Sequence, residues 1–171
     1  MNLQLPTDWP QFYTATIEGW DHLLQEENYK DVLISSFKFL TENNKVKINA
    51  FVIMDNHTHL IWQAKGGYSL KEAQTAFKKY TSQQFLKLLK EDNKLEKYEV
   101  DKADRKHHFW KRNSFGFELF SPAVLLQKLN YIHNNPVKAG ISTHPEEYKY
   151  SSASFYAGAA DRFGILEDYR G

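Results

Sequence analysis

Runs of apolar residues predict where this chain forms strands. In Gln11–Ile17 (QFYTATI) the polarity of successive residues alternates, and the segment is rich in Tyr, Thr and Ile, which is typical of a strand. In Val46–Met54 (VKINAFVIM) apolar residues occupy both alternating sets of positions, which indicates a strand buried on both sides and central in its sheet. Asp55-Asn56 can form a tight turn into a second strand at His57–Gln63, so we expect an antiparallel hairpin here.

Three other segments repeat apolar residues at the spacing of an α-helix. Each repeat places its members on one face, which would pack against the sheet. The apolar stripes are Leu33, Phe37 and Leu40 in the first helix, Leu70, Ala73, Phe77, Tyr80 and Leu88 in the second, and Leu125, Leu129 and Ile132 in the third.

Local signals give the ends of these helices. Asn43-Asn44 predicts a turn after the first helix. Ser69 with Glu72 three residues later forms a capping-box signature at the start of the second. Ser121-Pro122 begins the third, with Ser as N-cap and Pro at the first helical position. Pro136 is expected to stop the third helix.

The segment between the second and third helices is less regular. Asp92–Lys106 carries alternating charge without apolar periodicity, which predicts a surface loop. Lys106–Phe120 (KHHFWKRNSFGFELF) predicts one strand, or a hairpin broken near Asn113–Gly116. The resulting order βαββαβα predicts an α+β fold, an antiparallel sheet with packed helices that is close to the ferredoxin-like pattern.

Composition narrows the class of protein. At 171 residues the chain has the usual size of one domain, so we expect residues 1–171 to form a single domain. Cysteine is absent, which excludes disulfides and thiolate metal sites. The sequence has neither a secretory signal nor 18 consecutive apolar residues, so we expect a cytoplasmic protein outside the membrane. The formal net charge is only +1, so any nucleic-acid site must be a local patch.

His57 and His59 are the first candidate functional residues. Because side chains alternate along a strand, both point to one face with Cβ atoms roughly 6 to 7 Å apart, and two imidazoles at that spacing can bind one ion. Thr58 points the other way. Taken alone, the two histidines could equally be half-buried structural residues that bond to carbonyls or carboxylates.

The third helix has a polar side as well as its apolar stripe. At 100° per residue Tyr131, Asn135 and Lys128 share the side opposite Leu125, Leu129 and Ile132. A tyrosine there is either a surface residue or a functional one. Asn135 is either a helix terminator before Pro136 or part of a site.

Two segments together resemble the paired signatures of the REP-associated tyrosine transposases, which are HUH single-strand DNA transposases of the IS200-like type. They are residues 54–62 (MDNHTHLIW) and 131–140 (YIHNNPVKAG). The resemblance implies that His57 and His59 bind a metal and that Tyr131 is the nucleophile. Asn135 falls where related transposases carry a glutamine that completes the metal site, and the shorter side chain ligates directly or through a water.

The resemblance also implies a reaction. The enzyme would cut single-stranded DNA through a 5′-phosphotyrosine intermediate, release a free 3′-hydroxyl, and rejoin strands without a nucleotide cofactor. The implied cofactor is a divalent metal, Mg²⁺ or Mn²⁺. Imidazole ligands favour manganese, because magnesium prefers oxygen.

Single-stranded or hairpin DNA is the partner that this activity requires. Cations would bind phosphates and aromatic rings would stack on unpaired bases. His133 lies at the margin of the apolar stripe and is expected to be structural. The sequence leaves a monomer and a homodimer both open. The candidate DNA contacts are Lys78, Lys79, Tyr80, Trp110, Lys111, Arg112, Lys128 and Lys138.

Two rival functions remain at this point. A catalytically inactive module derived from a transposase could hold a DNA hairpin with the same fold, although it would have no chemical need for His57, His59 and Tyr131 together. An unrelated metal hydrolase would normally need a carboxylate ligand or base beside the histidines, and Asp55 is the only near candidate in the sequence.

Overall fold

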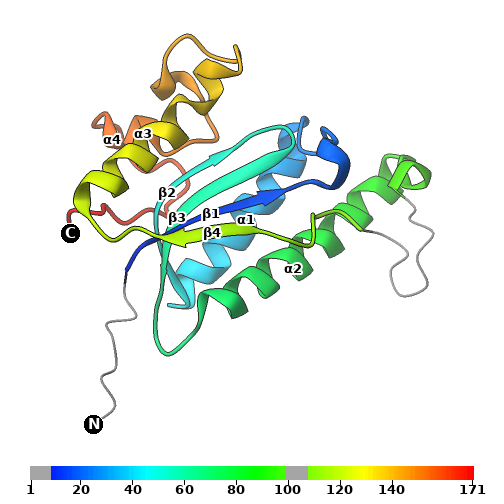
Figure 1. Cartoon of the computed structure of the whole chain (residues 1–171). Helices are drawn as coiled ribbons and strands as arrows, with labels where there is room; N and C mark the ends of the chain where they lie inside the picture. Colours follow the sequence, from blue (N-terminus) through cyan, green and yellow to red (C-terminus); the bar gives the residue numbers. More distant parts are fainter. Residues whose placement is uncertain (1–8, 99–107) are drawn as a thin grey trace.

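The chain folds around one antiparallel sheet of four strands in the order β2-β3-β1-β4 (Figure 1). This computed structural model describes residues 9–98 and 108–171. The strands are β1 (Gln11–Thr16), β2 (Val46–Ile53), β3 (His57–Ala64) and β4 (Phe115–Glu118). The α-helices are α1 (Glu27–Glu42), α2 (Leu70–Glu91), α3 (Pro122–Lys138) and α4 (Ala153–Tyr156). Three 3-10 turns are η1 (Glu18–Trp20), η2 (Leu95–Tyr98) and η3 (Pro145–Glu147).

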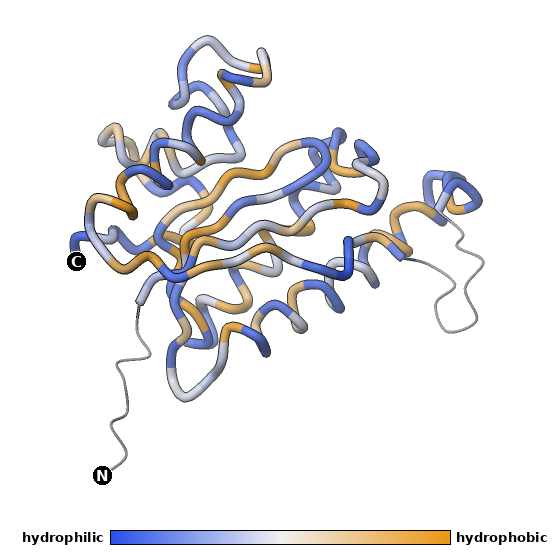
Figure 2. The backbone as a smooth tube through the Cα atoms, in the orientation of Figure 1, coloured by the Kyte–Doolittle hydropathy of each residue, from blue (hydrophilic) through white to orange (hydrophobic). Residues whose placement is uncertain are grey.

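Helices cover both faces of the sheet. α1 and α2 lie on one face and α3 crosses the other (Figure 1). The residues of each strand divide between two apolar cores accordingly. Tyr13 and Trp62 pack with α1 and α2, whereas Phe12 and Ile61 pack with α3. Hydrophobic residues follow the strands between these layers (Figure 2). The predicted α+β, ferredoxin-like arrangement is confirmed, with α3 added on the second face.

The register of β3 positions the candidate histidines. β3 lies between β2 and β1, and in its pairing with β1 Thr16 lies opposite His57 and Thr14 opposite His59. Ile61, two residues further along β3, belongs to the core under α3. Because side chains alternate, both histidines project to one face, as the sequence predicts, and Ile61 identifies it as the α3 face.

β2 is buried on both faces as predicted, but the prediction that it is central is wrong. The strand order places β2 at the edge. The C-terminal segment covers that edge: Ile53 N donates to Tyr150 O (2.8 Å), Ser152 N to Phe51 O (3.0 Å) and Glu167 N to Ile48 O (2.9 Å). These bonds satisfy an edge that would otherwise be open to other strands, which the hydrophobic pattern of β2 alone could not reveal.

The prediction that Pro136 stops the third helix is also wrong. α3 continues through Pro136 to Lys138. After its C-cap Ala139 comes Gly140 (φ 75°), where Ile141 N donates to Pro136 O (2.9 Å) and Gly140 N to Val137 O (3.0 Å). This bonding is a Schellman motif, which needs a left-handed residue that glycine supplies at little cost. Asn135 therefore lies within regular helix, one turn after Tyr131.

The predicted starts of the second and third helices agree with the structure. Ser69 and Glu72 form the capping box of α2, and the Ser121 side chain caps α3. Within the described part of Lys106–Phe120, residues 108–120, only Phe115–Glu118 is a strand, with a single bridge between Trp110 and Ile17. Residues 99–107, which include most of the predicted loop, lie outside the described residues. No helix in the described part of the chain is long and apolar enough to cross a membrane.

Candidate active site

His57 and His59 lie together on the α3 side of the sheet. Their ring centroids are 4.7 Å apart and the rings meet edge to face. The alternation of β3 brings them to one face, and the neighbouring strand supplies Phe12, whose ring stacks on His59 at 5.3 Å. The pair is thus enclosed on one side by the sheet and on another by an aromatic ring.

His59 is buried and is held through one nitrogen only. It is 5% exposed, and its Nδ1 lies 2.7 Å from Thr14 Oγ1. Its Nε2 is buried and has no hydrogen-bond partner among the described residues. Burial, the neighbouring His57 and Lys128 lower the pKa of His59 to about 3. The ring is therefore neutral at physiological pH, and its unpartnered buried nitrogen is available to a ligand.

His57 is held between two asparagines. Its Nδ1 is 2.7 Å from Asn56 Oδ1. An amide oxygen can only accept, so in the tautomer with Nδ1 as the donor the Nε2 lone pair is available to a ligand. Burial lowers the pKa of His57, and a hydrogen bond with the Asn135 side chain acts in the opposite direction. The neutral imidazole is the form that ligates a metal.

Tyr131 lies over the histidine pair from α3. Its side chain is 43% exposed, and its ring centroid is 5.4 Å from that of His59. Leu125, Leu129 and Ile132 bury the opposite side of α3 in the core, as the stripe predicts. The phenol consequently faces both the histidines and solvent, where a DNA strand could reach it.

Lys128 places a cation at the same point. Its Nζ is 5.2 Å from each of the ring centroids of Phe12, Phe117 and Tyr131. Three rings around one ammonium restrain it by cation–π attraction. A positive charge is thus fixed beside Tyr131 and His59, in the position where an anionic phosphate would be attracted.

A buried lysine anchors the turn that precedes His57. Lys30 Nζ donates to Asp55 Oδ1 (2.9 Å), Leu24 O (2.6 Å) and Gln25 O (3.1 Å). The ammonium group thus has three acceptors, which compensates for its burial. Asp55, the carboxylate that a hydrolase would need, is occupied by this ion pair. The arrangement fixes the turn and hence the start of β3.

His133 contacts the C-terminal segment. It is buried, its Nε2 lies 2.8 Å from Ser152 Oγ, and burial lowers its pKa to about 4. The residue ties α3 to the C-terminal segment, which agrees with the structural role predicted for it.

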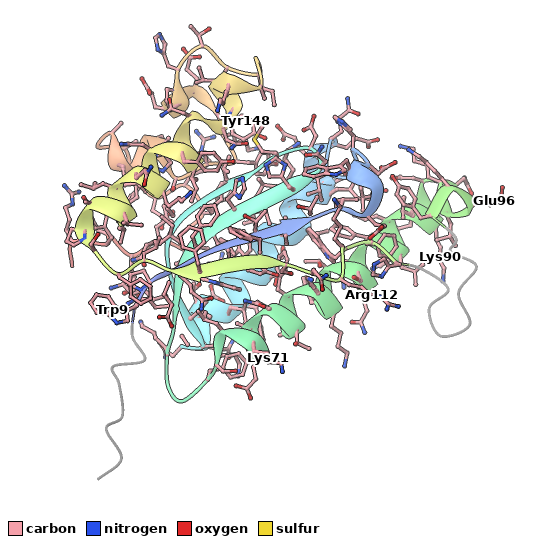
Figure 3. All side chains as sticks on the ribbon, in the orientation of Figure 1. Trp9, Lys71, Lys90, Glu96, Arg112 and Tyr148 are labelled. Carbon is pink, nitrogen blue, oxygen red and sulfur yellow. The ribbon has the colours of Figure 1, made fainter. Side chains whose placement is uncertain are left out.

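The predicted DNA contacts fall into three groups. Lys128 and Lys111 lie at the site, since Lys111 contacts Trp20 and Trp20 contacts His57. Lys138 is exposed in the last turn of α3, and Arg112 is exposed at the sheet edge near α2 (Figure 3). Lys78, Lys79 and Tyr80 belong to α2, which covers the opposite face of the sheet.

Trp110 does not fit its predicted role in stacking on DNA. It is 3% exposed, its Nε1 donates to Thr81 Oγ1 (2.9 Å), and its ring packs against Phe77 and Phe85. The indole is part of the core beneath α2. A tryptophan next to Lys111 and Arg112 looks accessible in sequence, but the bridge to Ile17 turns it inward.

Sequence reasoning missed four residues that shape the site: Thr14, Asn56, Lys30 and Trp20. Asn56 could have been noticed, because it directly precedes His57. Thr14 requires the β1–β3 register, and Lys30 and Trp20 require the packing of loops against the turn.

The donor atoms fit a divalent metal ion. His57 and His59 offer neutral imidazoles, Nε2 of His59 is an orphaned buried atom, and Asn135 adds an amide. Among residues 9–98 and 108–171, no three His, Cys, Asp or Glu side chains are grouped to hold a metal. Any third protein ligand would thus have to be of another type, such as this asparagine.

Two solved structures are similar to this chain. A solved structure described as a REP-associated tyrosine transposase bound to a REP hairpin has a TM-score of 0.65, 17% identity, and covers 95% of this chain and 90% of that one. At this identity the likeness concerns the fold. A second structure, described as a candidate transposase from Deinococcus radiodurans, has a TM-score of 0.48 and 13% identity, and covers 78% of this chain and 97% of that chain.

Sequence comparison identifies the family. No curated protein sequence matches the chain. The sequence profile of the family "Transposase IS200 like" matches residues 20–135, which include His57, His59, Tyr131 and Asn135. Because this match spans more than half of the 171 residues, the chain belongs to the IS200-like transposase family.

Proposed function

We propose that this transposase is a metal-dependent endonuclease and strand transferase that acts on single-stranded, hairpin-forming DNA through a 5′-phosphotyrosine intermediate. One observation carries the proposal: the ring centroids of Tyr131 and His59 lie 5.4 Å apart, and the buried Nε2 of His59 has no partner in the described part of the chain. A nucleophile and a vacant ligand atom at one point are what phosphodiester cleavage with a metal requires.

His57, His59 and Asn135 would hold the metal. A bound divalent ion would polarise the phosphate oxygens and offset the charge that develops on them. The hydrogen bonds to Asn56 and Thr14 orient the two imidazoles for this purpose. Two nitrogen ligands with one amide favour Mn²⁺ over Mg²⁺.

Tyr131 would perform the covalent step. Its phenolic oxygen attacks the scissile phosphorus and forms a P–O bond to the tyrosine while the bond from phosphorus to the 3′-oxygen breaks. The phenolic proton is lost and the leaving 3′-oxygen gains a proton, so the products are a 5′-phosphotyrosine and a free 3′-hydroxyl. Attack by a 3′-hydroxyl on the phosphotyrosine reverses the step and joins two strands without an external energy source.

Lys128 would steer the phosphate into position. Its ammonium group is held among Phe12, Phe117 and Tyr131, so it is ordered before DNA binds. Fixing a charge in advance reduces the reorganisation needed during the reaction. Rings around the site suit unpaired bases better than a closed duplex. The fold relative was solved with a REP hairpin, which makes a hairpin the substrate to try first.

Trapping a covalent adduct tests the proposal. The protein is mixed with a pool of hairpin-bearing single strands and Mn²⁺, and the products are separated under denaturing conditions. We expect wild type to form a protein–DNA adduct and Tyr131→Phe to form none while still retaining DNA. Tyr80→Phe is the matched control, because Tyr80 is similarly exposed but lies on the opposite layer, and it should form adduct.

Two results would overturn the proposal. An adduct of unchanged mobility with Tyr131→Phe would place the nucleophile elsewhere. A wild-type protein that binds the pool but never forms adduct with either Mn²⁺ or Mg²⁺ would be a hairpin-binding module without cleavage activity.

A further inference from the structure

Trp20 is an exposed aromatic residue that has no part in the apolar cores. Its side chain is 56% exposed, and it ends η1, directly after β1. Its ring centroid lies 6.4 Å from that of His57. The indole is therefore accessible to a ligand at a position beside a metal-ligand candidate.

The backbone holds Trp20 in this place. Its φ angle is 57°, a left-handed conformation that residues with a Cβ rarely adopt, and Gly19 before it has φ 66°. Trp20 N donates to Ile17 O (3.0 Å). The tight turn directs the indole toward His57.

Lys111 adds a cation to the same surface. Its Nζ lies 4.1 Å from the centroid of the Trp20 ring, and its backbone N donates to Thr16 O (2.8 Å). Trp110 faces the core beneath α2, so the alternation of this segment turns Lys111 toward the opposite face, where the histidines lie. Trp20 and Lys111 together are called the stacking platform below.

The carboxylates nearest to Trp20 in sequence have partners of their own. Glu18 Oε2 lies 3.3 Å from His108 Nε2. Asp21 accepts a hydrogen bond from Tyr98 and pairs with Lys97 at 3.1 Å. Each acid is therefore paired with another residue, and the platform presents a ring and a positive charge.

We propose that the stacking platform binds the nucleotide next to the scissile phosphate: Trp20 stacks on its unpaired base and Lys111 contacts its phosphate. The proposal rests on the proposed function, because the scissile phosphate is placed at His57 and His59. The platform and Tyr131 flank the histidine pair, at His57 and His59 respectively, so the strand would run across the pair. A ring with an adjacent cation is the pairing that single-strand binding uses without base-specific hydrogen bonds.

Binding to two matched DNA pools separates stacking from charge. Both pools are hairpins with single-stranded flanks of mixed sequence, and in one pool the flank nucleotides are abasic. Every protein carries Tyr131→Phe, so that no strand is cut when Mn²⁺ is present. Trp20→Gly is the test variant, because glycine accepts the left-handed backbone and the fold is retained. Trp9→Gly is its control, since Trp9 is 43% exposed at the opposite end of β1 (Figure 3).

We expect Trp20→Gly to weaken binding to the base-bearing pool by roughly five- to 150-fold, the range for loss of one stacked base, and to leave the abasic pool almost unaffected. Trp9→Gly should change binding to neither pool. Trp20→Phe should recover part of the affinity for the base-bearing pool that Trp20→Gly loses. Lys111→Gln should weaken both pools alike and reduce the salt slope by about 0.7, the value for one phosphate of a single strand.

The outcomes distinguish the two proposals. If the parent protein binds and Trp20→Gly binds the base-bearing pool equally well, the platform is refuted and the proposed function stands. If Trp9→Gly loses as much as Trp20→Gly, the effect is not specific to the platform and the inference is wrong. If the parent protein binds neither pool, the proposed function fails and the platform fails with it.

Discussion

Thr14 Oγ1 lies 2.7 Å from His59 Nδ1, so a residue of β1 orients the imidazole of a residue in β3. The antiparallel register that pairs these two residues produces the contact. It leaves Nε2 of His59 as the atom available to a ligand, next to Tyr131. Partners of this kind around metal-binding histidines typically contribute about 10- to 100-fold in metal affinity or activity.

Replacing Thr14 by valine should therefore weaken the metal site. Thr14→Val keeps the branched shape that suits a strand and removes only the hydroxyl. We expect Mn²⁺ affinity to fall about 10- to 100-fold in calorimetric titration. Thr16→Val is the control, because Thr16 lies opposite His57 in the same register, and His57 Nδ1 bonds to Asn56 instead. Equal losses in both variants would show that the effect comes from the strand and not from the hydrogen bond.

The double variant His57→Ala, His59→Ala should lose metal-dependent stabilisation. A ligand that binds only the folded state at 100 times its dissociation constant adds about 2.7 kcal/mol to the free energy of unfolding. We expect Mn²⁺ to raise the Tm of wild type and EDTA to reverse the increase, with no response in the double variant. A Tm increase of the same size in both proteins would place the metal elsewhere.

Removing a positive charge from α3 should weaken DNA binding more than removing one from α2, which covers the opposite face of the sheet. Lys128 lies beside Tyr131, whereas Lys79 is exposed on α2 over the opposite face. Lys128→Gln should weaken binding of a single-stranded hairpin and reduce its salt slope by about 0.7. Lys79→Gln should leave both nearly unchanged. Anisotropy titrations at several salt concentrations measure the affinity and the salt slope of each variant. A larger loss for Lys79→Gln than for Lys128→Gln would mean that DNA crosses the α2 layer.

Wild type should also prefer a hairpin with single-stranded flanks to a blunt duplex of the same length. The rings of the site need unpaired bases, and Tyr131 needs an accessible phosphate. Competition by the two DNAs at one salt concentration measures the preference. A duplex that competes equally well would contradict the proposed mode of binding.

Stability should fall in acid partly because of His133. Its native pKa is about 4 against an ordinary value of 6.5, because burial disfavours the charged ring. The unfolded chain therefore takes up the proton first as the pH is lowered. The contribution of neutral His133 to the free energy of unfolding is complete above pH 6.5 and is lost as the pH falls toward 4. At pH 4.5 this loss is about 2 to 3 kcal/mol.

His133→Gln tests this, since an amide can still bond to Ser152 but does not titrate. Urea unfolding at pH 7.5 and pH 4.5 should show a smaller acid loss in the variant than in wild type. His57 and His59 titrate in both proteins, so their contribution cancels in the difference. Equal acid losses would mean that His133 is not buried as a neutral ring.

The sequence by itself determined the features that repeat along one segment. Strand alternation placed His57 and His59 on one face, and helical spacing placed Tyr131 and Asn135 together on the polar side of α3. The capping box of Ser69 and Glu72 gave the start of α2. Each of these depends on backbone geometry over a few residues, which a local pattern encodes directly.

Only the tertiary structure decided which segments meet. The C-terminal segment covers the edge of β2, the β1–β3 register places Thr14 against His59, and Lys30 anchors the turn before β3. The same packing buries Trp110 while it leaves Trp20 exposed beside His57. These contacts join residues far apart in sequence, and their free energy depends on how whole layers pack, so no local pattern carries them.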